Sequence, residues 1–326
     1  MDTPGGGRVT RTRYGLLACF LAASLCFGGT FVAAKAGLDY LPPLLFVALR
    51  FDVGAVLLLG YVVAAYPREQ WLPRTRADAT GILAAGVFAI GLANAFVFVG
   101  QAGVTSGVGS VVYSLNPILT PVFAAVLLSD ERLSRGKAVG MLLGFAGVAL
   151  AVGVDPAALF GGGLASKAAV LAAAVSGAFG SVLVRRADAS LPNAVRTAWA
   201  VPVAALLCHA LSLAAGETPA AATWTPTALV ALGYVGVFST AVAFVAYFAL
   251  LDEAGAIRGN LVFYVVPVVA TLGGWALLGE SVSASTLVGF ATIAAGFAVV
   301  GHEQLAAELS RLRAVVGRTV GAARSQ

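Results

Sequence analysis

The chain has 326 residues, of which 60% are hydrophobic and only 11% are charged, and its formal net charge is +5. A soluble domain carries about 25% charged residues, and a soluble fold of this length could not hide so much apolar surface from water. The composition therefore excludes a soluble globular protein. The basic residues occur in short clusters between apolar runs, which is typical of cytoplasmic loops and excludes a nucleic-acid-binding face.

Apolar segments along the chain predict an all-α integral membrane protein with ten transmembrane helices. A hydrocarbon core of roughly 30 Å requires about 20 residues in helical form, and the alternation of a β-barrel strand is absent from the sequence. The expected spans are 14–35, 42–65, 79–101, 104–128, 137–154, 166–184, 196–215, 226–251, 256–279 and 283–301. The third and fourth spans are separated by very few residues, as are the eighth and ninth.

The distribution of positive charge predicts the orientation. With the N-terminal segment 1–13 in the cytoplasm, most of the 20 basic residues fall in inner segments, a pattern that requires an even number of spans. Both termini of this multi-pass cell-membrane protein are then cytoplasmic. In the tail, 302–326, leucines recur at helical spacing between arginines, which predicts an amphipathic helix on the membrane surface, with a disordered tail as the alternative.

An internal repeat divides the chain into two halves, 14–154 and 166–301, joined by a linker at 155–165. The segment NPILTPVFAAVLLSDERLS (116–134) resembles VPVVATLGGWALLGESVS (266–283), so that Pro117 matches Pro267 and Glu131 matches Glu280. The next matches are Gly140 with Gly289 and Gly147 with Gly296. Because each half holds five spans, an odd number, the halves are expected to be inverted, which is the architecture of many secondary transporters.

Several of these segments resemble a known family. CFGGTFVAAKAGL (26–38), PPLLFVALRF (42–51) and the two segments that run from proline to glutamate are similar to EamA-type members of the drug/metabolite transporter superfamily. The resemblance implies a ten-helix secondary carrier with cytoplasmic termini, in a family that moves amino acids, other metabolites, drugs and nucleotide sugars. The second half departs from the first, because Ala200-Val201 stands where the first half has Arg50-Phe51.

Two charged residues, Arg50 and Asp52, lie inside the second span, where charge is costly and therefore indicates function. Residues two apart on a helix do not face each other, so each is expected to meet a partner on another helix or water. The functional interpretation is that Arg50 attracts an anionic group of the cargo. Asp52, if buried, would bind a proton or a cationic group. The alternative is a static pair with polar neighbours that fixes helix packing.

Uncharged polar residues and prolines supply the remaining candidates. Polar side chains expected to line a cavity near the midplane are Asn94, Tyr113, Asn116, Asn260 and Tyr264. Hydrogen bonding between helices explains any one of them equally well. Three prolines remove helix hydrogen bonds and could form gating kinks or merely shape the bundle; they are Pro117, Pro121 and Pro267.

The function predicted from these patterns is secondary transport of small metabolites or drugs by alternating access. The alternatives are a channel-like or structural membrane protein and, with less support, an intramembrane enzyme. The sequence has no HExxH, no paired histidines, no G-x-S-x-G and no phosphate-binding loop, so no cofactor or metal is expected. The expected partners are a small-molecule cargo and the lipid bilayer. Proton coupling and a homodimer are left open.

Overall fold

The computed structural model describes residues 13–128, 135–152, 163–260 and 262–300, and within them every regular element is a helix. Expected segments near Glu131, most of the linker and the C-terminal tail lie outside the described residues. The elements are α1 (Arg13–Leu38), α2 (Pro43–Ala65), η1 (Arg68–Gln70), α3 (Arg76–Ala84), η2 (Ala85–Leu92), α4 (Ala93–Gln101), α5 (Ser106–Tyr113), α6 (Asn116–Leu127), α7 (Arg135–Val152), α8 (Leu164–Ala187), α9 (Asn193–Ala214), η3 (Pro219–Ala221), α10 (Pro226–Gly233), η4 (Tyr234–Val242), α11 (Ala243–Asn260), α12 (Val262–Leu278) and α13 (Ala284–Val300).

The structure confirms an all-helical protein with several membrane-spanning helices. Seven segments are long and apolar enough to cross a bilayer. Three shorter apolar helices lie where the fifth, ninth and tenth spans were expected, at Ala138–Gly147, Val265–Leu278 and Ala284–Gly296. The exact number of ten crossings stays a prediction.

Two of the expected spans differ from simple helices. The fourth span is divided between α5 and α6, with the break at Ser114 and Leu115 just before Pro117. The eighth span does not end at residue 251, because α11 continues in helical form to Asn260. The segment after Leu251 contains no proline before Pro267, so the residue that most strongly breaks a helix is absent there.

Two π-helical segments interrupt the long third span of each half at matching places. They are η2 and η4, which begin at Ala85 and Tyr234. In η4 the Thr240 hydroxyl donates to the carbonyl oxygen of Val235 at 2.8 Å, a bond across five residues. π-Helical turns are rare and occur mostly at functional sites, so both segments direct attention to the elements packed against them.

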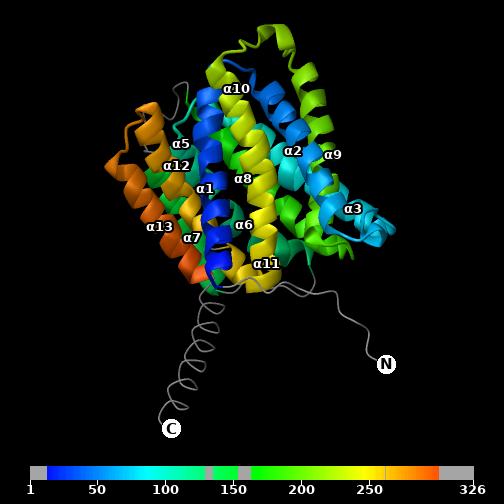
Figure 1. The fold of residues 1–326 in the computed structure, drawn as a ribbon. Helices are drawn as coiled ribbons and strands as arrows, with labels where there is room; N and C mark the ends of the chain where they lie inside the picture. Colours follow the sequence, from blue (N-terminus) through cyan, green and yellow to red (C-terminus); the bar gives the residue numbers. More distant parts are fainter. Residues whose placement is uncertain (1–12, 129–134, 153–162, 261, 301–326) are drawn as a thin grey trace, which may run out of the picture.

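The helices form one bundle with two pairs of partners on opposite sides (Figure 1). α2 and α9 lie side by side at one edge, and α7 packs along α13 at the other. α1 and α8 lie between these pairs. Each pair joins one helix from the first half of the chain to one from the second half, so that the two halves share a single core.

Glycines in α7 and α13 touch the backbone of the opposite helix reciprocally. A methyl group added at Gly147 would lie 2.7 Å from the carbonyl oxygen of Gly289, and one added at Gly296 would lie 2.6 Å from that of Gly140. These are the same four glycines that the internal repeat matches, but each one touches the glycine that is not its repeat counterpart. Small residues allow membrane helices to approach at such distances, so these glycines serve as packing contacts.

The π-helices contact the paired helices in the same reciprocal way. A methyl group added at Gly86 of η2 would lie 2.7 Å from Cβ of Val203 on α9. One added at Gly236 of η4 would lie 2.8 Å from Cβ of Val53 on α2. The two contacts are equivalent in the repeat, because Gly86 corresponds to Gly236 and Val53 corresponds to Val203. Each half therefore places its π-helix on the paired helix of the other half.

Candidate functional site

A buried guanidinium marks the centre of the candidate site. Arg50 of α2 is 3% exposed and lies where η4 and α4 meet. Its Nε and Nη2 atoms both donate to the Thr240 hydroxyl at 3.3 Å, and its Nη1 atom donates to Oδ1 of Asn94 at 3.3 Å. Asn94 is held in turn by its own bond to the carbonyl oxygen of Ile90, at 2.8 Å.

Aromatic rings complete the surroundings of the Arg50 charge. The guanidinium carbon lies 5.0 Å from the ring centroid of Phe51 and 5.3 Å from that of Phe98, both fully buried. Cation–π attraction at these distances offsets part of the cost of desolvation. In the described part of the chain no carboxylate lies within ion-pair distance of Arg50. A buried cation held only by neutral groups is costly and is suited to receive an anion.

Two more of the predicted residues lie near this arginine. Tyr113, at the end of α5, is close enough to Arg50 to interact with its charge, and its ring packs 6.2 Å from that of Phe31. Asn116 forms a side-chain hydrogen bond with Tyr113 and packs against Gly177 of α8. Arg50, Asn94, Tyr113 and Asn116 thus form one polar cluster, in which Arg50 is buried and the other three are partly buried. We call these four residues, with Thr240, the central cluster.

Asp52 lies elsewhere, which corrects the expectation that it is buried. Its side chain is 47% exposed, and its Oδ2 atom lies 2.8 Å from Nε2 of His209 on α9. The reason is helical geometry, because residues two apart are separated by about 200° around the axis. With Arg50 directed into the bundle, Asp52 is directed out of it. The expectation that the two residues have different partners is confirmed.

The remaining predicted residues are placed only in part. Asn260 ends α11 and Tyr264 lies in α12, but their side chains are outside the described part of the structure. Pro117 is the second residue of α6, directly after the break from α5. Pro121 and Pro267 lie inside α6 and α12. Their roles as gates stay predictions.

Carboxylates tie the ends of helices across the two halves. Glu217, just after α9, accepts from the backbone N–H groups of Leu44 and Leu45 at 3.1 and 2.7 Å. Glu280, after α12, accepts from the backbone N–H of Ser106 at 3.0 Å and from its hydroxyl at 3.2 Å. Both carboxylates satisfy N–H groups at a helix start, where negative charge is stabilising. Glu280 therefore caps the start of α5.

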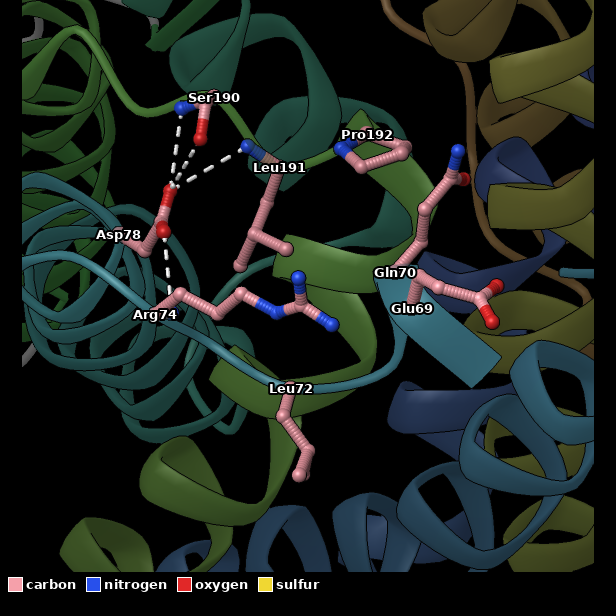
Figure 2. Close-up of a pocket in the computed structure, with 8 residues that line it drawn as sticks. All are labelled: Glu69, Gln70, Leu72, Arg74, Asp78, Ser190, Leu191 and Pro192. Atoms are coloured by element: carbon pink, nitrogen blue, oxygen red, sulfur yellow. Dashed lines mark hydrogen bonds between the residues drawn. The ribbon is translucent and has the colours of Figure 1, made fainter. Parts of the chain in front are cut away.

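A third carboxylate, Asp78, lies beside a cavity between α3 and the start of α9 (Figure 2). One of its oxygens accepts from the backbone N–H and hydroxyl of Ser190 at 3.0 and 3.2 Å and from the N–H of Leu191 at 3.3 Å. The other closes a capping box with Thr75. The cavity measures about 260 Å³ and is lined by Glu69, Gln70, Leu72, Arg74, Asp78, Ser190, Leu191 and Pro192. It lies at the ends of helices, away from the central cluster.

Sequence analysis did not predict two contacts at the candidate site, those made by Thr240 and by His209. Thr240 lies in an apolar stretch, and nothing in the sequence distinguishes its hydroxyl group from others. Aligning the third span of each half, 79–101 with 226–251, would nevertheless have placed Thr240 near the second span. The contact of His209 with Asp52 was also not predicted. A signal existed, because these are the only carboxylate and histidine that both lie inside expected spans of the α2–α9 pair. Among the described residues, no group of three His, Cys, Asp or Glu could hold a metal ion.

Comparison with known proteins identifies the family. The model of the EamA-like transporter family matches residues 13–153 and again 165–301. The chain therefore belongs to the EamA-like transporter family, as the sequence resemblance predicted. The two matched ranges correspond to the two halves that share the bundle. The protein is a multi-pass membrane transporter.

Similar proteins are described as transporters or as an efflux pump. An uncharacterized transporter of Archaeoglobus fulgidus is 27% identical over 282 residues, covering 86% of this chain and 96% of the relative. The uncharacterized inner membrane transporter YedA of Escherichia coli K12 is 28% identical over 270 residues, covering 82% and 84%. A Salmonella typhimurium protein named "Probable amino-acid metabolite efflux pump" is 28% identical over 286 residues, covering 85% and 91%. One solved crystal structure has the same fold, with a TM-score of 0.61 and 24% identity over 89% of this chain and 98% of the other.

Proposed function

We propose that the protein is a secondary transporter that moves small solutes by alternating access. Its two halves, 14–154 and 166–301, would each cross the membrane five times in opposite orientation, with both termini in the cytoplasm. The reciprocal contacts of Gly147 with Gly289 and of Gly296 with Gly140 support this arrangement. Inverted halves can exchange conformations, which opens a central site to one side and then to the other.

The single observation that carries the proposal is the environment of Arg50. A buried cation with neutral hydrogen-bond partners and aromatic neighbours can bind an anionic group of the cargo, such as a carboxylate. Asn94 and Tyr113 add polar groups that can orient the remainder of the molecule. Ala200, at the corresponding place of the second half, adds none. The site is therefore asymmetric, although the two halves are related.

The cargo class proposed is a small metabolite that carries a carboxylate. The Salmonella relative named as an amino-acid metabolite efflux pump supports amino acids and their derivatives as the first candidates. The energy source would be the gradient of the cargo itself or of protons. The direction of net transport then follows the gradients, because a carrier is reversible.

Counterflow in proteoliposomes tests the proposal. Vesicles are loaded with unlabelled amino acids, and uptake of a radiolabelled amino-acid mixture is followed. The proposal predicts transient accumulation above equilibrium, because only a carrier exchanges labelled for unlabelled cargo. Simple equilibration would indicate a channel. The absence of uptake for all amino acids would contradict the proposed cargo class.

Variants at Arg50 then test the site. Arg50→Ala is expected to weaken apparent affinity at least tenfold, since a charged hydrogen bond in a desolvated site contributes about 1.5–3 kcal/mol. Arg50→Lys keeps the charge and is expected to fall between wild type and the alanine variant. Arg186→Ala is the matched control, because Arg186 is exposed at the end of α8. Normal affinity in monodisperse Arg50→Ala protein would rule out direct binding by this residue.

A further inference from the structure

The contact between Asp52 and His209 lies outside the central cluster and joins the two halves of the chain. The carboxylate belongs to α2 and the imidazole to α9, and their facing atoms are 2.8 Å apart. A carboxylate and an imidazole in contact can hold a proton between them. We propose that Asp52 and His209 together form a proton-binding site of the transporter.

The position of the pair along the helices places it within reach of one membrane surface. α2 begins and α9 ends at the same side of the bundle, because Glu217 follows α9 and binds the backbone of Leu44 and Leu45. At 1.5 Å per residue, Asp52 lies about 14 Å and His209 about 8 Å from that side. A proton from the adjacent aqueous phase can therefore reach the imidazole first.

The surface around the pair explains why it holds a proton. The neighbouring exposed side chains one turn away are apolar: Val56 and Leu206 are each 72% exposed. Isolated charges are costly among such groups in a bilayer, whereas a carboxylate and an imidazole that share one proton are neutral as a pair. Binding of a second proton leaves a neutral carboxyl group beside an imidazolium, which removes the attraction between α2 and α9. Loss of the shared proton leaves a lone carboxylate.

Few other titratable groups face the pair. Cys208, next to His209, interacts with the charges of both Asp52 and Arg50, and Arg50 itself is directed into the bundle. α4, α10 and η2 carry no titratable side chain.

On the other elements packed against α2 and α9, several titratable groups have partners of their own. Tyr234 of η4 donates to the Leu25 carbonyl oxygen, Lys35 of α1 binds carbonyls at the end of α4, and Asp78 of α3 binds the turn before α9. In α11 the Tyr247 ring packs against Phe27. The remaining titratable residues of these elements are Arg13, Tyr14, Cys19 and Cys26 of α1, Tyr61 of α2, Arg76 of α3, Arg196 of α9, and Asp252, Glu253 and Arg258 of α11.

The proposal deepens the transport function by naming where a proton gradient would act, and it therefore rests on that function. A proton bound by the imidazole from one side adds charge attraction to the contact between the halves at the α2–α9 edge. The same proton is released when the pair separates. This couples protonation to the relative position of the two halves without any contact between the proton site and the cargo.

Histidine NMR tests the site without any cargo. The chain has only two histidines, so His302→Gln leaves His209 as the single ¹⁵N-histidine signal in full-length protein in nanodiscs. The expected result is a titration whose midpoint differs between wild type and Asp52→Asn, because the substitution removes the charged group that lies next to Nε2. Asp39→Asn, at an exposed acid between α1 and α2, is the matched control and leaves the midpoint unchanged. Identical midpoints with Asp52 and with Asn at position 52 would overturn the proposal.

Two additions keep the outcome decisive. If the Asn variant does not stay monodisperse, the same titration in Asp52→Ser provides the comparison. In proteoliposomes, Asp52→Asn should abolish stimulation of amino-acid uptake by a pH gradient while leaving counterflow intact. Unchanged stimulation would overturn the proton site alone. Failure of counterflow in the wild-type protein would instead contradict the proposed function, so the two failures are distinguishable.

Discussion

Arg50 of α2 and Thr240 of η4 are joined by two hydrogen bonds of 3.3 Å, although 190 residues separate them in the chain. The bonds connect the charged group of the first half to the π-helix of the second. The Thr240 hydroxyl can accept both because its own proton is donated to the carbonyl oxygen of Val235. The irregular helix thus orients an acceptor toward a buried cation.

Thr240→Val is expected to destabilise the protein by about 1–3 kcal/mol, because a buried donor group then lacks its acceptor. The measurement is thermal unfolding of the purified protein in detergent. Thr240→Ser retains the hydroxyl and should lose much less. Thr292→Val is the matched control, since the Thr292 hydroxyl bonds only within its own helix, to Val288. Equal losses at positions 240 and 292 would contradict a special role for Thr240.

Gly86→Ala is expected to lower stability by more than about 1 kcal/mol, because the added methyl group would meet the Ala200 carbonyl oxygen at 2.7 Å and backbone cannot easily move.

Gly60→Ala is expected to have the opposite effect on stability. Gly60 is exposed on α2 with nothing near its absent Cβ, so alanine should stabilise the helix by about 0.5–1 kcal/mol. Thermal unfolding curves of the two variants check whether stability falls in Gly86→Ala and rises in Gly60→Ala. Unchanged stability of Gly86→Ala would argue against tight packing of η2 on α9.

Glu280→Gln is expected to cost about 1–2 kcal/mol, because the carboxylate accepts charge-assisted bonds from the backbone and hydroxyl of Ser106 at the start of α5. The variant should also show faster proteolysis in the segment between α12 and α13. Glu69→Gln, at an exposed acid of η1, is the control and should behave like wild type. A proteolysis pattern identical to that of wild type would be evidence against the capping contact.

Much of the architecture could be predicted because hydropathy, charge and repetition are strong signals in a membrane protein. The repeat that matches Gly140 with Gly289 and Gly147 with Gly296 marked four glycines that the structure places in the contact between α7 and α13, although the sequence did not predict this contact. The π-helices could not be predicted, because their residues have the same apolar character as an ordinary helix. The extension of α11 past Leu251 was missed because hydropathy marks the end of an apolar run rather than the end of a helix.

The candidate site was predicted in part. The cost of intramembrane charge selected Arg50 correctly as a buried group, and polarity selected Asn94 as its neighbour. The same reasoning treated Asp52 as buried, because the sequence alone does not say which side of α2 faces the bundle. Thr240 was missed, since one hydroxyl in an apolar span carries little information without the packing of η4 on α2.

The central claim, inverted halves in one membrane, is tested most directly by labelling single cysteines in intact cells. In a background without Cys19, Cys26 and Cys208, one cysteine is placed at Gln70, Asp188, Ala220 or Ser281, all in the connections between long helices. The account predicts that an impermeant maleimide labels positions 220 and 281 from outside the cell and labels positions 70 and 188 only after permeabilisation. Labelling of positions 70 and 220 from the same side would contradict it.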